Sequence, residues 1–138
     1  MTRATDRAAV VARAIQASLT GDSSVVARVF TADVHASLPP SVTCAAELAV
    51  EIEDRRDVFA DVELSVASSE SRGERTWVEW HAEVTHVGSL FVEEALVPAT
   101  GRRVDVRGIT VADFEGERIA RFRQYWDWSG LLHEEEPR

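Results

Sequence analysis

The 138-residue sequence contains no lysine and no asparagine, and all 15 of its basic residues are arginine. Without lysine the chain has no Schiff-base nucleophile and no phosphate-loop lysine, and without asparagine it has no acceptor for an N-linked glycan. Cys44 is its single cysteine, which excludes an internal disulfide and a cysteine-cluster metal site. These absences remove several common kinds of catalytic and binding chemistry.

Acidic residues outnumber basic ones by 24 to 15, so the formal net charge is −9. Nucleic acids and anionic membranes both attract clustered positive charge, and we therefore expect neither as a partner. No apolar run approaches the roughly 20 residues that cross a bilayer. Asp6 and Arg13 interrupt the apolar N-terminal segment, so a secretory signal is not expected. The expected location is the cytoplasm.

The length predicts a single domain over residues 1–138, with residues 1–4 and 133–138 expected to be flexible. A chain of this size buries roughly 68% of its unfolded surface, which is enough to form a real core. Apolar residues recur at helical spacing in three stretches, and a brief strand before Pro39 and Pro40 separates the second stretch from the third. The helices are expected over residues 5–19, 22–30 and 43–59, and the strand over residues 34–38.

After Ala60 the apolar period changes to two, which is the period of β-strands. The alternation is cleanest from Thr76 to Val87, where every second residue is apolar. Three helices followed by hairpin-linked strands predict an α+β fold, with helices packed on one face of a curved antiparallel sheet. The strands are expected over residues 62–66, 76–87, 90–97, 103–114 and 118–126, with a turn over residues 68–74.

The two faces of the predicted sheet differ in chemistry. The inner face is mainly apolar, as expected where helices cover it, whereas the outer face carries charges of both signs that can pair across strands. The outer face is either a salt-bridged surface in solvent or the interface of a homodimer. Its number of large apolar residues favours the homodimer. These residues are Trp77, Ile109, Val111, Ile119 and Tyr125.

Three segments resemble those of SnoaL-like, polyketide cyclase-like proteins of the nuclear transport factor two-like superfamily. The segments are RTWVEWHAEVTHVG at residues 75–88, PATGRRV at 98–104 and FEGERI at 114–119. The order of elements matches the family over nearly the whole chain. The resemblance implies a cone-shaped α+β barrel with a mixed or antiparallel sheet, and an apolar pocket between the helices and the concave face. Relatives include cyclases, isomerases and epoxide hydrolases, so the fold does not decide the reaction.

The resemblance also implies positions for catalytic residues. In the cyclases an aspartate on the last strand moves a proton beside a carbonyl group, and a histidine on the preceding strand lies near it. These positions fall on Gln124 and Thr110 here, and neither an amide nor a threonine hydroxyl can do that work. An arginine and an aspartate of the epoxide hydrolases match the positions of Phe91 and Glu93 here. Of these two residues only Glu93 is acidic.

Two residues are candidates for a catalytic base. Glu93 shares a strand face with Phe91, and the resemblance points this face inward, where an enclosed carboxylate can act as a general base. The alternative is an edge-strand glutamate in water. His35 is expected near the mouth of the pocket, where it could act as a base or donate to a ligand carbonyl group. The alternative is a histidine paired with backbone groups.

The remaining predictions concern a pocket and its possible guests. Gln124 and Thr110 are expected to orient a small hydrophobic molecule in this pocket. Aromatic side chains are expected to form its walls, and the alternative is that they are ordinary core residues. His81 and His86 lie on opposite strand faces, and no cluster with the spacing of metal ligands was recognised, so neither a metal nor a cofactor is expected. The expected walls are Trp80, Phe91, Phe122 and Trp126.

Two functions therefore remain open. The first is a cofactor-free cyclase, isomerase or hydrolase acting on an apolar carbonyl or epoxide substrate, with Glu93 or His35 as the base. The second is a non-catalytic module that binds a ligand or assembles as a dimer, having lost the acid/base aspartate at position 124. Both interpretations share a pocket for a small molecule.

Overall fold

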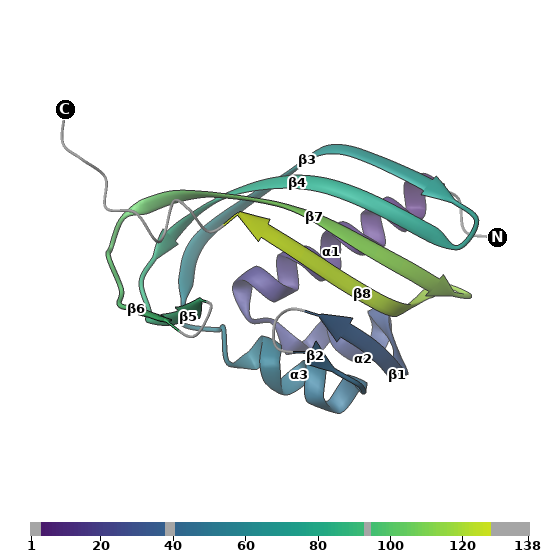
Figure 1. Cartoon of the computed structure of the whole chain (residues 1–138), viewed down its shortest axis with the longest axis horizontal. Helices are drawn as coiled ribbons and strands as arrows, with labels where there is room; N and C mark the ends of the chain where they lie inside the picture. Colours follow the sequence, from purple (N-terminus) through teal and green to yellow (C-terminus); the bar gives the residue numbers. More distant parts are fainter. Residues whose placement is uncertain (1–3, 38–40, 93–94, 128–138) are drawn as a thin grey trace.

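A computed structural model describes residues 4–37, 41–92 and 95–127, and side chains are described from Asp6 onward except those of residues 91–95. Ala4 begins the first helix, whereas the rest of the two segments expected to be flexible lies outside the described residues. The sheet arches over the helices, which lie together on its one side (Figure 1). The helical elements are α1 (Ala4–Thr20), the 3₁₀ turn η1 (Ser23–Val25), α2 (Val26–Val29) and α3 (Ala45–Glu53).

Six strands form one open, mixed sheet in the order β2-β1-β8-β7-β4-β3. β1 runs parallel to β8, and the other neighbours are antiparallel. The predicted α+β architecture, with three helices on a curved mixed sheet, is confirmed. The six strands are β1 (Phe30–Ser37), β2 (Ser41–Val42), β3 (Phe59–Arg72), β4 (Arg75–His86), β7 (Arg103–Glu115) and β8 (Arg118–Asp127).

The helix ends follow from local chemistry. α1 ends where Gly21 adopts a φ of 81°, and a Cβ there would collide with the backbone of Arg56. The carboxylate of Asp22 then accepts a hydrogen bond from the Ser24 amide at 3.0 Å and caps η1. α3 ends at Glu53, earlier than predicted, because Phe59 pairs with His86 at the start of β3. Pairing with a neighbouring strand here overrides helical spacing.

Two segments differ from the predicted strands. Residues 68–72 belong to β3 and not to a turn, because their backbone pairs with β4 as far as Arg72. Residues 90–97 were expected to form one strand, but they form β5 (Leu90–Val92) and β6 (Ala95–Val97), which pair with each other as a hairpin. Alternation of apolar residues cannot distinguish these cases, because it does not report which strand is the partner.

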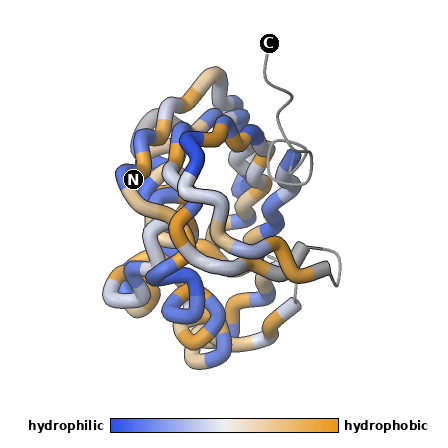
Figure 2. The backbone as a smooth tube through the Cα atoms, turned by 90° about the vertical axis from the view of Figure 1, so that its left-hand side faces the viewer, coloured by the Kyte–Doolittle hydropathy of each residue, from blue (hydrophilic) through white to orange (hydrophobic). Residues whose placement is uncertain are grey.

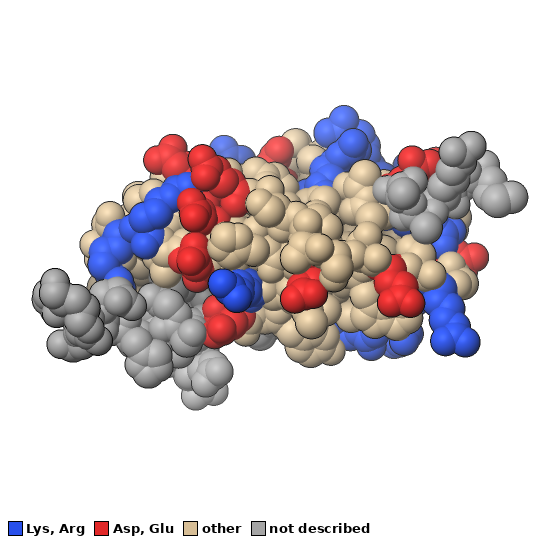
Figure 3. Space-filling model, turned by 90° about the horizontal axis from the view of Figure 1, so that it is seen from above, with Lys and Arg blue, Asp and Glu red and all other residues tan. Residues whose placement is uncertain are grey.

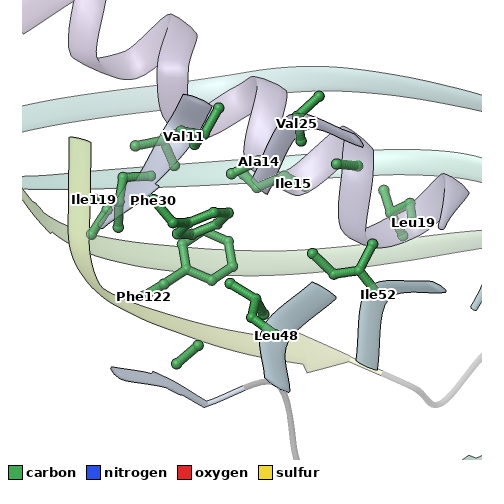
Figure 4. Packing of buried hydrophobic residues seen from close by; sticks show 14 of the residues in the cluster. Val11, Ala14, Ile15, Leu19, Val25, Phe30, Leu48, Ile52, Ile119 and Phe122 are labelled. Carbon is green, nitrogen blue, oxygen red and sulfur yellow. The ribbon is translucent and has the colours of Figure 1, made fainter. Parts of the chain in front are cut away.

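The core lies between the helices and the inner face of the sheet (Figure 4). Phe30 from β1 meets Phe122 from β8 edge to face, with ring centroids 5.2 Å apart. Leu48 and Ile52 from α3 and Ile15 from α1 pack into the same cluster. Along the tube of Figure 2, hydrophobic and hydrophilic residues alternate over many short stretches, which matches strands that have one covered face.

The prediction that Ile119 belongs to the outer face was wrong. The β7–β8 register shifts between Asp113 and Phe114, so that Phe114 lies opposite Ile119 and one extra β8 residue is accommodated. This bulge reverses the alternation at the start of β8. Ile119 is therefore fully buried in the core, on the same side of the sheet as Phe122.

The outer face carries a largely uncharged area in its middle, and charged side chains of both signs surround it (Figure 3). Ile109 and Tyr125 are 45% and 59% exposed, while Trp77 is half-buried and Val111 is buried. Arg75 holds Asp113 across β4 and β7 with two hydrogen bonds, of 2.6 and 3.1 Å. This pair lowers the pKa of the Asp113 carboxyl group.

Candidate functional site

A continuous chain of hydrogen bonds crosses the interior from the sheet to α1. The Trp80 indole Nε1 donates to Thr110 Oγ1 at 2.9 Å, and the Thr110 hydroxyl donates to Gln124 Oε1 at 3.1 Å. Gln124 Nε2 then donates to Ser18 Oγ at 3.1 Å, and the Ser18 hydroxyl donates to the Ile15 carbonyl oxygen at 2.7 Å. All four polar side chains are at most 4% exposed.

This chain gives position 124 a structural role. Buried polar groups are costly when they lack partners, and here Trp80 donates the first bond while Thr110, Gln124 and Ser18 each accept one bond and donate another. The amide of Gln124 is suited to the middle of the chain because it carries a donor and an acceptor on one planar group. Gln124 thus ties β8 to both β7 and α1.

The inner face is tightly packed around Trp80. The Trp80 ring lies against Gly108 on the neighbouring strand, and a Cβ at Gly108 would come within 2.6 Å of it. The ring also meets Trp126 edge to face, with centroids 5.1 Å apart. Trp80 is 1% exposed, whereas Trp126 is partly exposed. Of these two predicted pocket walls, Trp126 is therefore the one within reach of solvent.

Arg55 is a site residue that the sequence analysis overlooked. It follows α3, and its guanidinium carbon lies 5.6 Å from the centroid of the Trp126 ring. Burial lowers the pKa of Arg55, and the negative charge of Glu51 opposes this shift. The sequence contains a signal for it, because Arg55 continues the helical spacing of the buried residues Leu48 and Ile52.

His86 lies at the end of β4 and is fully buried. Its Nδ1 is 3.2 Å from Thr100 Oγ1, and its ring lies 6.0 Å from that of Phe59. Burial lowers the pKa of His86, so the neutral imidazole is favoured there. His81 lies on the opposite face of the same strand, as predicted.

The structure separates the predicted site residues into two groups. Gln124, Thr110, Trp80 and Phe122 lie together in the interior, and Phe122 is a core residue packed against Phe30. His35 is exposed on the outer face of β1, whereas its neighbours Val34 and Ala36 are buried. In the register of β1 and β8 it lies opposite Arg121.

A base at His35 therefore cannot reach a ligand that contacts Gln124, because the sheet lies between the two side chains. Glu93 lies outside the described residues. Phe91 is placed in β5 by its backbone alone. The proposed roles of these two residues stay predictions.

One group of possible metal ligands was not recognised in the sequence. His81, Glu83 and Asp105 come together across β4 and β7 on the outer face, with one ligand atom of each within 4.8 Å of the others. His81 Nε2 is 3.2 Å from Asp105 Oδ1, and Arg103 Nη2 is 3.9 Å from Glu83 Oε1. The arginine therefore already supplies positive charge to this exposed group.

In the portion of the chain that the structure describes, no helix has both the length and the apolar content to cross a membrane. A search of curated proteins finds no significant match. Many solved structures share the fold at low sequence identity, and three illustrate their range. AclR from Streptomyces galilaeus, assigned as a hydroxylase, is 20% identical, with a TM-score of 0.73 over 94% of this chain and 80% of its own.

Two further structures are assigned as SnoaL-like polyketide cyclases. The one from Jannaschia sp. CCS1 is 16% identical, with a TM-score of 0.76 over 95% of this chain and 94% of its own. The one from Agrobacterium tumefaciens C58 is 17% identical, with a TM-score of 0.71 over 95% and 96%. At these identities the likeness concerns the fold alone. The sequence model of the family described as SnoaL-like polyketide cyclase matches residues 9–134, and the chain belongs to this family.

Proposed function

We propose that this protein binds a small, largely apolar molecule that carries a carbonyl or similar oxygen, without using residue 124 as an acid or base. The observation that carries this proposal is the buried chain from Trp80 to Ser18. An amide has no useful pKa for proton transfer, and both ends of the Gln124 side chain are engaged within the protein. The aspartate-dependent step of the family's cyclases therefore has no counterpart at this position.

The ligand is proposed to contact Trp126 and Arg55. Trp126 offers a partly exposed aromatic face, and the adjacent guanidinium adds positive charge beside it. In surroundings of low polarity a cation attracts a partially negative oxygen more strongly than it would in water. A ligand with an apolar body and one polar end fits this pair of residues.

A fluorescent probe tests this proposal. The apolar anion 8-anilinonaphthalene-1-sulfonate is expected to bind saturably to the folded wild-type protein, and Trp126→Leu is expected to weaken that binding by about tenfold, because an aromatic contact is lost. Tyr125→Leu is the matched control, because Tyr125 is the next residue and lies on the outer face. Equal losses in the two variants, or no saturable binding to the wild type, would contradict the proposal. Native mass spectrometry of freshly purified protein would reveal a ligand that co-purifies.

A second candidate is proton transfer with Glu93 as the base. The buried guanidinium of Arg55 favours it, because a cation beside a reacting carbonyl group stabilises the negative oxygen that forms when a proton is removed. This candidate keeps the family's type of chemistry but moves the base away from the last strand.

We also propose that two copies pair through the outer face. A hollow of about 570 Å³ and another of about 400 Å³ adjoin on this face and share Glu79 and Ile109 in their linings. Exposed Ile109 and Tyr125 supply apolar contact area. Glu79 and Arg107 border the larger hollow. In a two-fold interface each surface meets its own copy, so these opposite charges could pair across the axis.

A further inference from the structure

A separate hollow of about 200 Å³ lies where β2, β1 and β8 run side by side. Buried Val34 and Ala36 on β1 point towards the core, so His35 and Ser37 between and after them point outward. The lining holds two arginines, a histidine and several hydroxyl groups. The side chains that matter here are His35, Ser37, Ser41, Arg121 and Arg123.

The strand register brings these side chains together. His35 lies opposite Arg121, and Ser37 lies opposite Arg123 in the parallel β1–β8 pair. Ser37 also lies opposite Ser41 in the antiparallel β1–β2 pair, with the two hydroxyl oxygens 3.4 Å apart. Adjacent strands are about 4.8 Å apart, so donors on three strands can reach one small group between them.

The two arginines are only partly neutralised within the protein. Asp113 lies opposite Arg121 and its charge acts on both arginines, but its carboxylate hydrogen-bonds to Arg75, and among the described residues neither Arg121 nor Arg123 forms an ion pair. Arg123 Nε is buried and has no hydrogen-bond acceptor there. The nearby Glu47 carboxylate accepts instead from the Thr43 backbone amide at 2.9 Å. Positive charge and unused donors therefore gather at this edge of a chain whose net charge is −9.

We infer that this hollow binds the phosphoryl group of inorganic phosphate or of a small phosphate monoester. Guanidinium groups bind phosphate oxygens through paired, charge-assisted hydrogen bonds, and hydroxyl groups can serve the remaining oxygens. A planar carboxylate would be satisfied by one arginine, whereas donors arriving from three strands suit a tetrahedral group with oxygens in several directions. This inference is independent of the ligand proposed at Trp126 and Arg55, because the sheet separates that site from this hollow.

Titration calorimetry of the full chain with inorganic phosphate and with glycerol 1-phosphate tests the inference. We expect saturable binding of at least one of them in a chloride-containing buffer, and at least about tenfold weaker binding in Arg121→Gln and in Arg123→Gln. Arg118→Gln is the matched control, because it removes the same charge from an exposed position on the same strand outside the hollow, and its affinity should stay within about twofold. Equal affinities for the two probes would show that the phosphoryl group alone accounts for binding. Tighter binding of glycerol 1-phosphate would show that the glycerol substituent also contacts the protein.

Arg123 is partly buried, so Arg123→Gln could weaken binding by destabilising the fold and not by removing a phosphate contact. Arg121→Gln and His35→Gln change exposed side chains, and each should weaken phosphate binding without changing the midpoint of urea unfolding. NMR spectra should show phosphate-dependent shifts at the amides of Ser37 and Ser41. The inference is overturned if neither probe binds saturably, or if Arg118→Gln weakens binding as much as Arg121→Gln does.

Discussion

Replacing Gln124 with glutamate would change the buried hydrogen-bond chain by a single group of nearly the same shape. In the wild type, Gln124 Nε2 donates to Ser18 and Oε1 accepts from Thr110. A neutral carboxylic acid can reproduce both bonds, because its hydroxyl replaces the amide donor. An ionised carboxylate cannot donate to Ser18, and at a position that is 4% exposed it also loses most of its hydration.

The pKa of the introduced carboxyl group should therefore be raised in the folded state above its unfolded value of about 4.3. Between the two pKa values the folded state binds more protons, so stability is lost as the pH rises. The free energy of unfolding falls by about 1.4 kcal/mol for each pKa unit by which the folded state differs from the unfolded state. A shift of two to three units, common for a buried carboxyl group, would make Gln124→Glu about 3–4 kcal/mol less stable than the wild type at pH 7.5.

Urea unfolding followed by tryptophan fluorescence would measure this difference at several pH values between about 4.5 and 8. Subtracting the wild-type free energy of unfolding at each pH cancels the titrations that the two proteins share. Gln16→Glu is the matched control, because it makes the same change on α1 at a half-buried position, and its difference should stay within about 0.5 kcal/mol at every pH. A Gln124→Glu difference that is the same at pH 5 and pH 8 would refute the buried position of this side chain.

Three further predictions concern other residues. In an NMR titration the pKa of His86 should lie below the usual histidine value of 6.5. The stability that its neutral form contributes is therefore present above pH 6.5 and is lost as the pH falls. A normal titration would mean that water reaches the ring. Sedimentation velocity should show a wild-type dimer that Ile109→Arg converts to a monomer and Ile109→Val retains, whereas a monomeric wild type would remove the proposed interface. Once a substrate is found, Glu93→Gln should abolish turnover with an unchanged unfolding midpoint, while loss of folding would make Glu93 structural.

Much of the fold could be predicted from local patterns. The alternation from Thr76 onward predicted β4 almost to the residue, and helical spacing predicted α1 equally well, because both elements have one apolar face along their whole length. Local patterns were insufficient where a distant partner decides the structure. The β5–β6 hairpin and the extension of β3 to Arg72 depend on which strand supplies the hydrogen bonds.

The candidate site was less predictable than the fold. Parity along β8 placed Gln124 inward, but the bulge near Ile119 reversed the parity at the start of the same strand. His35 was expected near the mouth of the pocket, and the parallel pairing with β8 placed it on the outer face beside Arg121. That pairing joins segments far apart in the chain, so no local pattern reports it.

The sequence by itself determined the α+β architecture, the inward direction of residue 124 and the absence of lysine chemistry, because periodicity and composition are properties of the chain alone. Only the tertiary structure decided that Gln124 is held between Thr110 and Ser18, that Arg55 lies over Trp126, and that two arginines share a hollow with His35. The physical reason is that side-chain hydrogen bonds and charges act over a few ångströms. They therefore depend on which distant segments the packing of the core brings into contact.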